Sequence, residues 1–198
     1  MAYTTIDNPE LHFQTKLYTG DGNSNQTITF DGSENMQPDW VWIKLRSSAH
    51  QHTLIDSVRG VNKALLSNSN VSEDTDDQYG WLSSFNTNGF TTQDGSASAH
   101  WNVNKTSETY VSWNWKAGGS ASSNSNGSIT TSVSANTTAG FSIVSWTGNG
   151  TDGASIGHGL VNPNLCIIKR RDASGHGWFT GGYPNTSLFA NDGDHLNL

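Results

Sequence analysis

The chain has 198 residues, of which 33% are hydrophobic and 14% are charged, and its formal net charge is −7 at pH 7. This acidic balance disfavours binding to nucleic acids and to anionic membranes, because both need clustered Lys and Arg, and the ten basic residues are scattered. Eight Trp, seven Phe and five Tyr exclude a disordered chain, and the composition favours β-sheets joined by long polar loops.

Residues 1–12 are expected to form a polar lead-in. They have neither the basic flank nor the apolar core of a signal peptide. No apolar run in the chain approaches the ~18 residues that a membrane-spanning helix needs. We therefore expect synthesis in a cytoplasm, no signal peptide and no membrane insertion.

Residues 13–19 alternate between two faces with the period of two that is typical of a half-buried strand. The strongest predicted strand is 39–46, where Val41, Ile43 and Leu45 share one face. The opposite face carries Trp40 and Trp42, followed by Lys44 and Arg46. Further strands are expected at 26–30, 54–58, 63–66, 81–85, 89–92 and 110–116, and residues 68–77 are interpreted as an acidic surface loop.

Two stretches of the chain, residues 13–46 and 141–171, repeat each other. Phe13, Tyr18, Thr19 and Gly20 recur 128 positions later as Phe141, Trp146, Thr147 and Gly148. Further along, the offset is 125, so that Pro38, Ile43, Lys44 and Arg46 match Pro163, Ile168, Lys169 and Arg171. A repeat of this length indicates a duplicated domain, because solenoid repeats are shorter.

The repeat predicts a first β-sandwich over 13–117 and a second, truncated copy over 128–198, with strands at 128–134 and 165–169. Residues 118–127, rich in Gly, Ser and Asn, are interpreted as a flexible linker. The second copy has no counterpart of the 110–116 strand, and proteins rarely leave sheet edges bare. We expect either a longer natural product or another chain to complete it. No segment has a sustained helical period, so the predicted fold class is all-β.

Several short segments of the sequence resemble those of a known family. They are Phe-Gln-Thr-Lys-Leu-Tyr-Thr-Gly at 13–20, Gln-Pro-Asp-Trp-Val-Trp-Ile-Lys at 37–44, Tyr-Val-Ser-Trp-Asn-Trp-Lys-Ala-Gly-Gly at 110–119 and Ser-Ala-Asn-Thr-Thr-Ala-Gly-Phe-Ser-Ile-Val at 134–144. In these segments the chain resembles virion proteins of marine bacteriophages. Those proteins look like tail-fibre or appendage proteins built from duplicated concanavalin-like jelly-roll modules. The resemblance implies two antiparallel jelly-roll sandwiches, the second incomplete.

The function that the resemblance implies is that of a non-enzymatic structural protein of the virion. We expect the virion-proximal part of a tail fibre or appendage that takes part in host attachment. It would be a homo-oligomer, expected to be a trimer, and would contact other tail or capsid proteins. The alternatives are a lectin-like module that binds host surface glycans, a capsid decoration protein and, less favoured, a polysaccharide depolymerase.

Calcium is the one candidate cofactor. Asp21, Asn23 and Asn25 have a spacing that supplies oxygen ligands to Ca²⁺, but Gly32 stands where an EF-hand needs a glutamate. The same residue types suit a hairpin turn. The turn is the preferred interpretation.

Trp81, Trp101 and Trp178 lie in loop-like surroundings and are candidates for stacking on sugar rings, with burial in the core as the alternative. His50 and His52 with Asp56 could bind a metal, although a surface loop is favoured.

Cys166, the single cysteine, excludes an internal disulfide and is expected to be a buried, inert thiol. No catalytic motif is present, and in particular no Gly-x-Ser-x-Gly elbow. Lys44, Arg46, Lys169 and Arg171 are expected at sheet margins, either solvated or paired with carboxylates.

Overall fold

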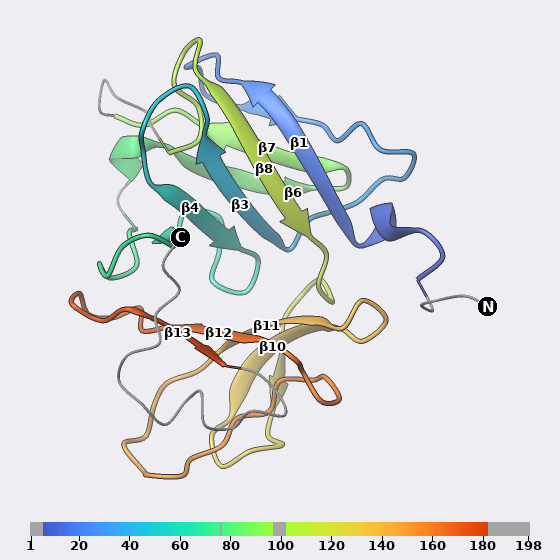
Figure 1. Ribbon diagram of the computed structural model, residues 1–198, viewed down its shortest axis with the longest axis vertical. Helices are drawn as coiled ribbons and strands as arrows, with labels where there is room; N and C mark the ends of the chain where they lie inside the picture. The colour runs from blue at the N-terminus through green and yellow to red at the C-terminus, as the bar shows by residue number, and fades with distance from the viewer. Residues whose placement is uncertain (1–5, 76, 97–101, 182–198) are drawn as a thin grey trace.

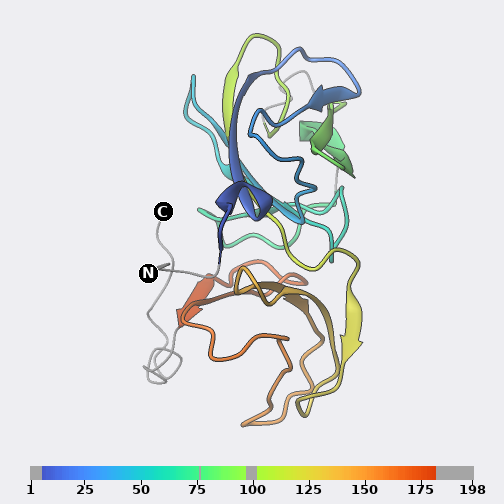
Figure 2. The same cartoon turned by 90° about the vertical axis from the view of Figure 1, so that its right-hand side faces the viewer.

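The structure is a computed structural model that describes residues 6–75, 77–96 and 102–181 (Figure 1). The predicted all-β class is confirmed, because the described residues form thirteen strands and only two short 3₁₀ turns, Pro9–Leu11 and Asp77–Tyr79. Every pair of neighbouring strands in the sheets is antiparallel. The chain forms two units, which lie one above the other along the longest axis (Figure 2).

The first unit is built on a five-stranded sheet of order β1-β8-β3-β4-β5. Its strands are β1 (Phe13–Thr19), β8 (Thr109–Trp115), β3 (Trp40–Leu45), β4 (His52–Asp56) and β5 (Leu65–Leu66). The alternation along β3 shows which face of the large sheet is buried. Val41 and Ile43 are fully buried, whereas Trp40 and Trp42 on the other face are half-buried.

A smaller sheet covers the inner face of the first. It has three strands, in the order β2 (Gln26–Ile28), β7 (Gly89–Gln93) and β6 (Trp81–Asn86). Val41, Ile43 and Tyr110 of the large sheet pack against Leu82 and Phe90 of the small one in a single apolar core. Two antiparallel sheets enclosing one core make the first unit a β-sandwich, as predicted.

The second unit has a three-stranded sheet and a separate hairpin. The sheet has the order β11 (Phe141–Ser145), β10 (Thr131–Asn136) and β9 (Ser122–Asn124), and the hairpin joins β12 (Cys166–Lys169) to β13 (Trp178–Gly181). This hairpin matches β3–β4. Lys44 pairs with His52 in the first unit, and Lys169 pairs with Trp178 in the second. The segment around Trp178 was expected to be a loop and is a strand instead.

The prediction of a flexible linker at residues 118–127 disagrees with the structure. Ser122–Asn124 form β9, which pairs with β10. The buried carboxylate of Asp39 accepts hydrogen bonds from the backbone N–H groups of Ala117 at 2.8 Å and Gly119 at 3.2 Å. Composition missed this because strand pairing and these bonds use backbone groups, which every residue type supplies.

Asp39 is therefore expected to fix the connection between the units. Asp39→Ala should lower the free energy of unfolding by about 2–3 kcal/mol, because it leaves buried N–H groups without an acceptor. Urea unfolding of the variant measures this cost. An unchanged free energy would show that water replaces the carboxylate at no cost and that the connection does not depend on Asp39.

Candidate functional site

The two units meet at what we call the inter-unit interface, formed by outer-face residues of the large sheet and by β11, β12, β13 and the segment after β12. One part of it is aromatic. Trp40 stacks on Trp115 with ring centroids 4.7 Å apart, and both stack on Phe141 of the second unit, at 5.6 Å and 6.3 Å. The outer face of β3, which carries Trp40 and Trp42 followed by Lys44, is thus covered at its tryptophan end by the other unit.

Trp178 is the centre of a second apolar cluster at the interface. Its side chain is only 6% exposed and packs with Leu54 and Leu65 of the first unit. Its indole N–H donates a hydrogen bond of 2.9 Å to the carbonyl oxygen of Leu66. Of the two alternatives for this tryptophan, the structure places it in the core. Its ring is not available for stacking on a sugar.

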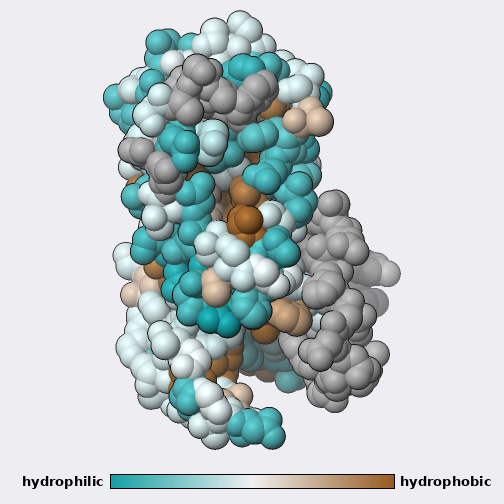
Figure 3. All heavy atoms as spheres, turned by 90° about the vertical axis from the view of Figure 1, so that its left-hand side faces the viewer, coloured by the Kyte–Doolittle hydropathy of each residue, from teal (hydrophilic) through white to brown (hydrophobic). Residues whose placement is uncertain are grey.

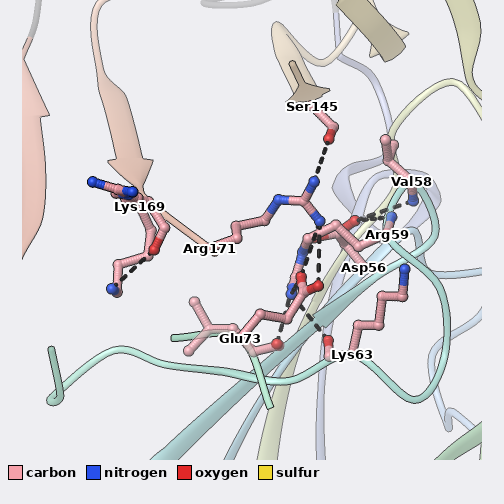
Figure 4. A network of polar contacts seen from close by, with 10 residues as sticks. Asp56, Val58, Arg59, Lys63, Glu73, Ser145, Lys169 and Arg171 are labelled. Carbon is pink, nitrogen blue, oxygen red and sulfur yellow. Dashed lines mark hydrogen bonds and ion pairs between the residues drawn. The ribbon is translucent and has the colours of Figure 1, made fainter. Parts of the chain in front are cut away.

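A charged network completes the interface (Figure 4). The guanidinium of Arg59 pairs with the carboxylate of Asp56 and, at 3.1 Å, with that of Glu73, and the three side chains are between 6% and 10% exposed. Arg171, which follows β12, binds the same Glu73 carboxylate at 3.1 Å and donates to Ser145 Oγ at 3.2 Å. Two arginines and two carboxylates balance one another in charge. Of the two carboxylates, Glu73 is the one that pairs with both arginines, and its pair with Arg171 crosses the interface.

Backbone contacts hold the same segments together. The N–H of Glu73 donates to the carbonyl of Arg171 at 2.8 Å, and the N–H of Gly175 donates to the carbonyl of Asn70 at 2.9 Å. The prediction of an acidic surface loop at residues 68–77 is thus wrong for Glu73. A run of acidic residues usually indicates solvent exposure, but here the balancing arginine is 98 residues away in the sequence.

The three calcium candidates lie in a hydrogen-bonded turn. Asp21 Oδ1 accepts from the N–H of Asn23 at 2.8 Å and from Asn104 Nδ2 at 3.0 Å. Asn25 has a positive φ of 65° and accepts from Gln93 Nε2 at 2.6 Å. Asp21 and Asn25 thus already accept hydrogen bonds from protein donors, which is the arrangement expected of the turn alternative.

The remaining candidates are dispersed. Trp81 is half-buried at the start of β6, and Trp101 lies outside the described residues. His52 Nδ1 accepts the indole N–H of Trp42 at 2.9 Å, whereas His50 contacts Asn102 at 3.3 Å. With Asp56 paired to Arg59, the structure does not bring the two histidines and this carboxylate together.

His52 gives the protein a pH-dependent contact. Burial, followed by the charge of Lys44, lowers the pKa of its imidazole, so the folded state favours the neutral ring that accepts from Trp42. The unfolded chain takes up a proton near pH 6.5, so this contribution to stability is present above about pH 6.5 and is lost as the pH falls further. As the pH is lowered from about 7 to about 5, we expect the melting temperature of His52→Gln to fall less than that of the wild type. Equal losses would contradict this role for His52.

Of the four basic residues at strand ends, Arg46 is exposed and Arg171 is paired with a carboxylate, as predicted. The two lysines instead donate to backbone carbonyls, Lys44 to Leu45 at 2.7 Å and Lys169 to His176 at 2.8 Å. Burial lowers the pKa of both ammonium groups. Cys166 is half-buried on β12 rather than fully buried, and burial raises the pKa of its thiol.

A surface pocket of about 660 Å³ lies in the first unit, next to the interface. Its polar lining consists of His50, Gln51, Asn68, Asp74 and Asn102. Tyr79, which is 38% exposed, and the apolar Ala49, Leu66 and Val71 complete the lining. Amide, carboxylate and imidazole groups beside an exposed aromatic ring can hydrogen-bond and stack on a sugar. These residues come from four separate segments of the chain, so no local sequence pattern marks them as one set.

The face drawn in Figure 3 is largely hydrophilic, with apolar residues in small, separate patches. In the described part of the chain, no helix has the length and hydrophobicity that crossing a membrane requires. Nor do three or more His, Cys, Asp or Glu residues within those ranges gather as a metal-binding group would.

Comparison with known proteins gives one result. No curated protein and no solved structure matches the chain. A family described as a domain of unknown function, DUF7483, matches residues 8–191, a range that extends across both units and the interface between them. The chain belongs to the DUF7483 family.

Proposed function

We propose that the protein is a non-enzymatic structural subunit of a bacteriophage virion, namely the virion-proximal part of a tail fibre or appendage that takes part in host attachment. The observation that carries the proposal is the inter-unit interface. A buried charge network, a buried tryptophan and an aromatic stack hold two related β-units in one fixed arrangement. Repeated units held at a fixed angle suit a protein that transmits position and force. The resemblance to jelly-roll appendage proteins supports the same proposal.

Mass spectrometry of purified phage particles that encode this chain tests the proposal. The protein should be present in a fixed number of copies per particle, in a complex with other tail or capsid proteins. Light scattering of residues 1–198 tests the expected trimer. Absence of the protein from washed particles would contradict the virion role. A stable monomer would contradict only the expected trimer and would leave the virion role standing.

Glycan binding is the second candidate function, and the pocket that contains His50, Asn68 and Tyr79 favours it. A glycan array on host polysaccharides should give binding that Tyr79→Ala reduces. Trp81→Ala is the control, because that half-buried tryptophan is not among the residues that line the pocket. Equal binding by the wild type and Tyr79→Ala would exclude the pocket as the site.

A further inference from the structure

Asparagine followed by glycine is the pair of residues that most readily loses ammonia in proteins, and the chain contains three such pairs. They are Asn88-Gly89, Asn126-Gly127 and Asn149-Gly150. In this reaction the backbone nitrogen of the glycine attacks the side-chain Cγ of the asparagine. Glycine favours the attack because it has no Cβ and adopts conformations that other residues avoid. The side chain and the backbone must be able to move toward each other, so the fold decides which pair reacts.

Asn149-Gly150 lies in an exposed loop of the second unit, between β11 and β12. All residues from 147 to 155 are exposed, and none of them belongs to a strand. Asn149 Oδ1 accepts a hydrogen bond of 3.0 Å from the N–H of Thr151. This donor faces the oxygen that takes up negative charge when Cγ is attacked, and such a donor lowers the barrier. Gly150 has a φ of 72°, and a Cβ placed on it would have no described atom within 4 Å outside its chain neighbours. This pair thus has room to react and a donor for the developing charge.

Asn88-Gly89, at the turn between β6 and β7, is held at both the side chain and the attacking nitrogen. Asn88 Nδ2 donates to the carbonyl of Phe30 at 3.2 Å, and the N–H of Met36 donates to Asn88 Oδ1 at 3.4 Å. The N–H of Gly89 donates to the carbonyl of Met36 at 3.2 Å. A Cβ on Gly89 would lie only 2.0 Å from the carbonyl oxygen of Ile28. Attack at this pair must first break these contacts, and each lost hydrogen bond raises the barrier.

Asn126-Gly127, between β9 and β10, is an intermediate case. Asn126 is exposed, and its N–H donates to Asn124 Oδ1 at 2.8 Å. Two hydrogen bonds between Ser128 and Ser155, of 3.1 Å and 2.8 Å, hold the residue that follows the pair. A Cβ on Gly127 would lie 2.5 Å from the carbonyl oxygen of Ser155. The asparagine is therefore accessible, whereas the glycine that must attack it has little room.

The repeat indicates that an aspartate fits at position 149. Asn149 matches Asp21 of the first unit, at the same offset of 128 residues as the start of the repeat. Asp21 Oδ1 accepts the N–H of Asn23 at 2.8 Å, which is the contact that Asn149 makes with the N–H two residues further along. A carboxylate oxygen accepts this bond as well as an amide oxygen does. Conversion of Asn149 to aspartate therefore keeps the turn and changes the charge.

We propose that Asn149 is a site of spontaneous deamidation. The nitrogen of Gly150 forms a bond to Cγ of Asn149 and gives up its proton, and the side-chain NH₂ group leaves with that proton as ammonia. A water molecule then opens the resulting succinimide ring at either carbonyl carbon and gives aspartate or isoaspartate. Each event adds one negative charge to a loop that already contains Asp152. The reaction needs only water, and the site holds whether or not the protein is part of a virion.

Peptide mapping by mass spectrometry tests the site. The folded wild-type protein is incubated in mildly alkaline buffer made with heavy-oxygen water, so that each product molecule takes up one labelled oxygen. Asn149 should convert at least roughly tenfold faster than Asn88, because Asn88 must first lose its hydrogen bonds. Asn126 should convert at an intermediate rate. In protein unfolded with guanidinium the three rates should become similar, because the contacts of the fold are gone. No conversion of Asn149, or equal rates at Asn149 and Asn88 in the folded protein, would overturn the proposal.

Gly150→Ala tests the attacking residue. The added methyl group hinders the approach of the nitrogen to Cγ, so deamidation of Asn149 should slow several-fold. Gly140→Ala is the matched control, because Gly140 also has a positive φ, of 67°, and no described atom within 4 Å of its Cβ position outside its chain neighbours. The control should deamidate at the wild-type rate. An unchanged rate in Gly150→Ala would overturn the proposal, and the wild-type rates decide the matter even where a variant fails to fold.

Discussion

Replacing Glu73 by alanine is expected to lower the free energy of unfolding by about 3–4 kcal/mol. The carboxylate is the one group that pairs with both Arg59 and Arg171, and Arg59 is only 6% exposed. Removing one partner of a buried ion pair is costly, because the remaining charge stays buried without full compensation. Urea unfolding at neutral pH measures the effect.

An exposed ion pair provides the control for Glu73. Asp31 pairs with Lys16 at 2.9 Å but is 75% exposed, so Asp31→Ala should change stability little. In the double variant Glu73→Ala with Arg171→Ala, the cost should be less than the sum of the single costs, because the two side chains lose a shared contact. Additive costs would show that Glu73 acts through Arg59 alone.

Trp178→Ala is expected to cost about 3–5 kcal/mol, the range measured for truncating a buried tryptophan. The side chain packs with Leu54 and Leu65 and donates to the carbonyl of Leu66. Trp178→Phe keeps most of the ring and removes the donor, so it should cost about 1 kcal/mol. Thermal unfolding of the three proteins measures both costs.

The effect of Trp178→Ala should be local to the interface and the second unit. The core of the first unit, built from residues such as Val41, Leu82 and Phe90, does not include Trp178. Amide exchange should therefore speed up in β12 and β13 and remain slow in β3 and β7. A uniform loss of protection in both units would show that they unfold together. It would mean that the first unit depends on the second for its stability.

The interface explains how a protein with few charged residues keeps two small units together. Aromatic stacking and the Trp178 cluster supply apolar burial, and the network around Glu73 adds directional contacts that fit one relative orientation. Asp39 fixes the backbone between the units through Ala117 and Gly119. These contacts therefore keep the second unit at a defined place relative to the first.

The sequence by itself determined the strands with strong alternation. β1 spans Phe13–Thr19 as predicted, and β3 and β8 differ from prediction by one residue at their ends. A period of two reports which side of a sheet is buried, and it needs no knowledge of the partner strands. The repeat likewise matched residues 141–171 with 13–46, because matching residues can be compared without coordinates.

Only the tertiary structure decided what covers the outer face of β3 and which residues form the interface. Trp178 and Leu66 are 112 positions apart in the sequence, and Glu73 and Arg171 are 98 apart. Neither pair lies in a segment with a periodic pattern. Contacts between such distant segments depend on how the two units dock, which local alternation and propensity do not encode. For the same reason β9 and β13 were not predicted from the sequence, because short strands are stabilised mainly by the neighbours that pair with them.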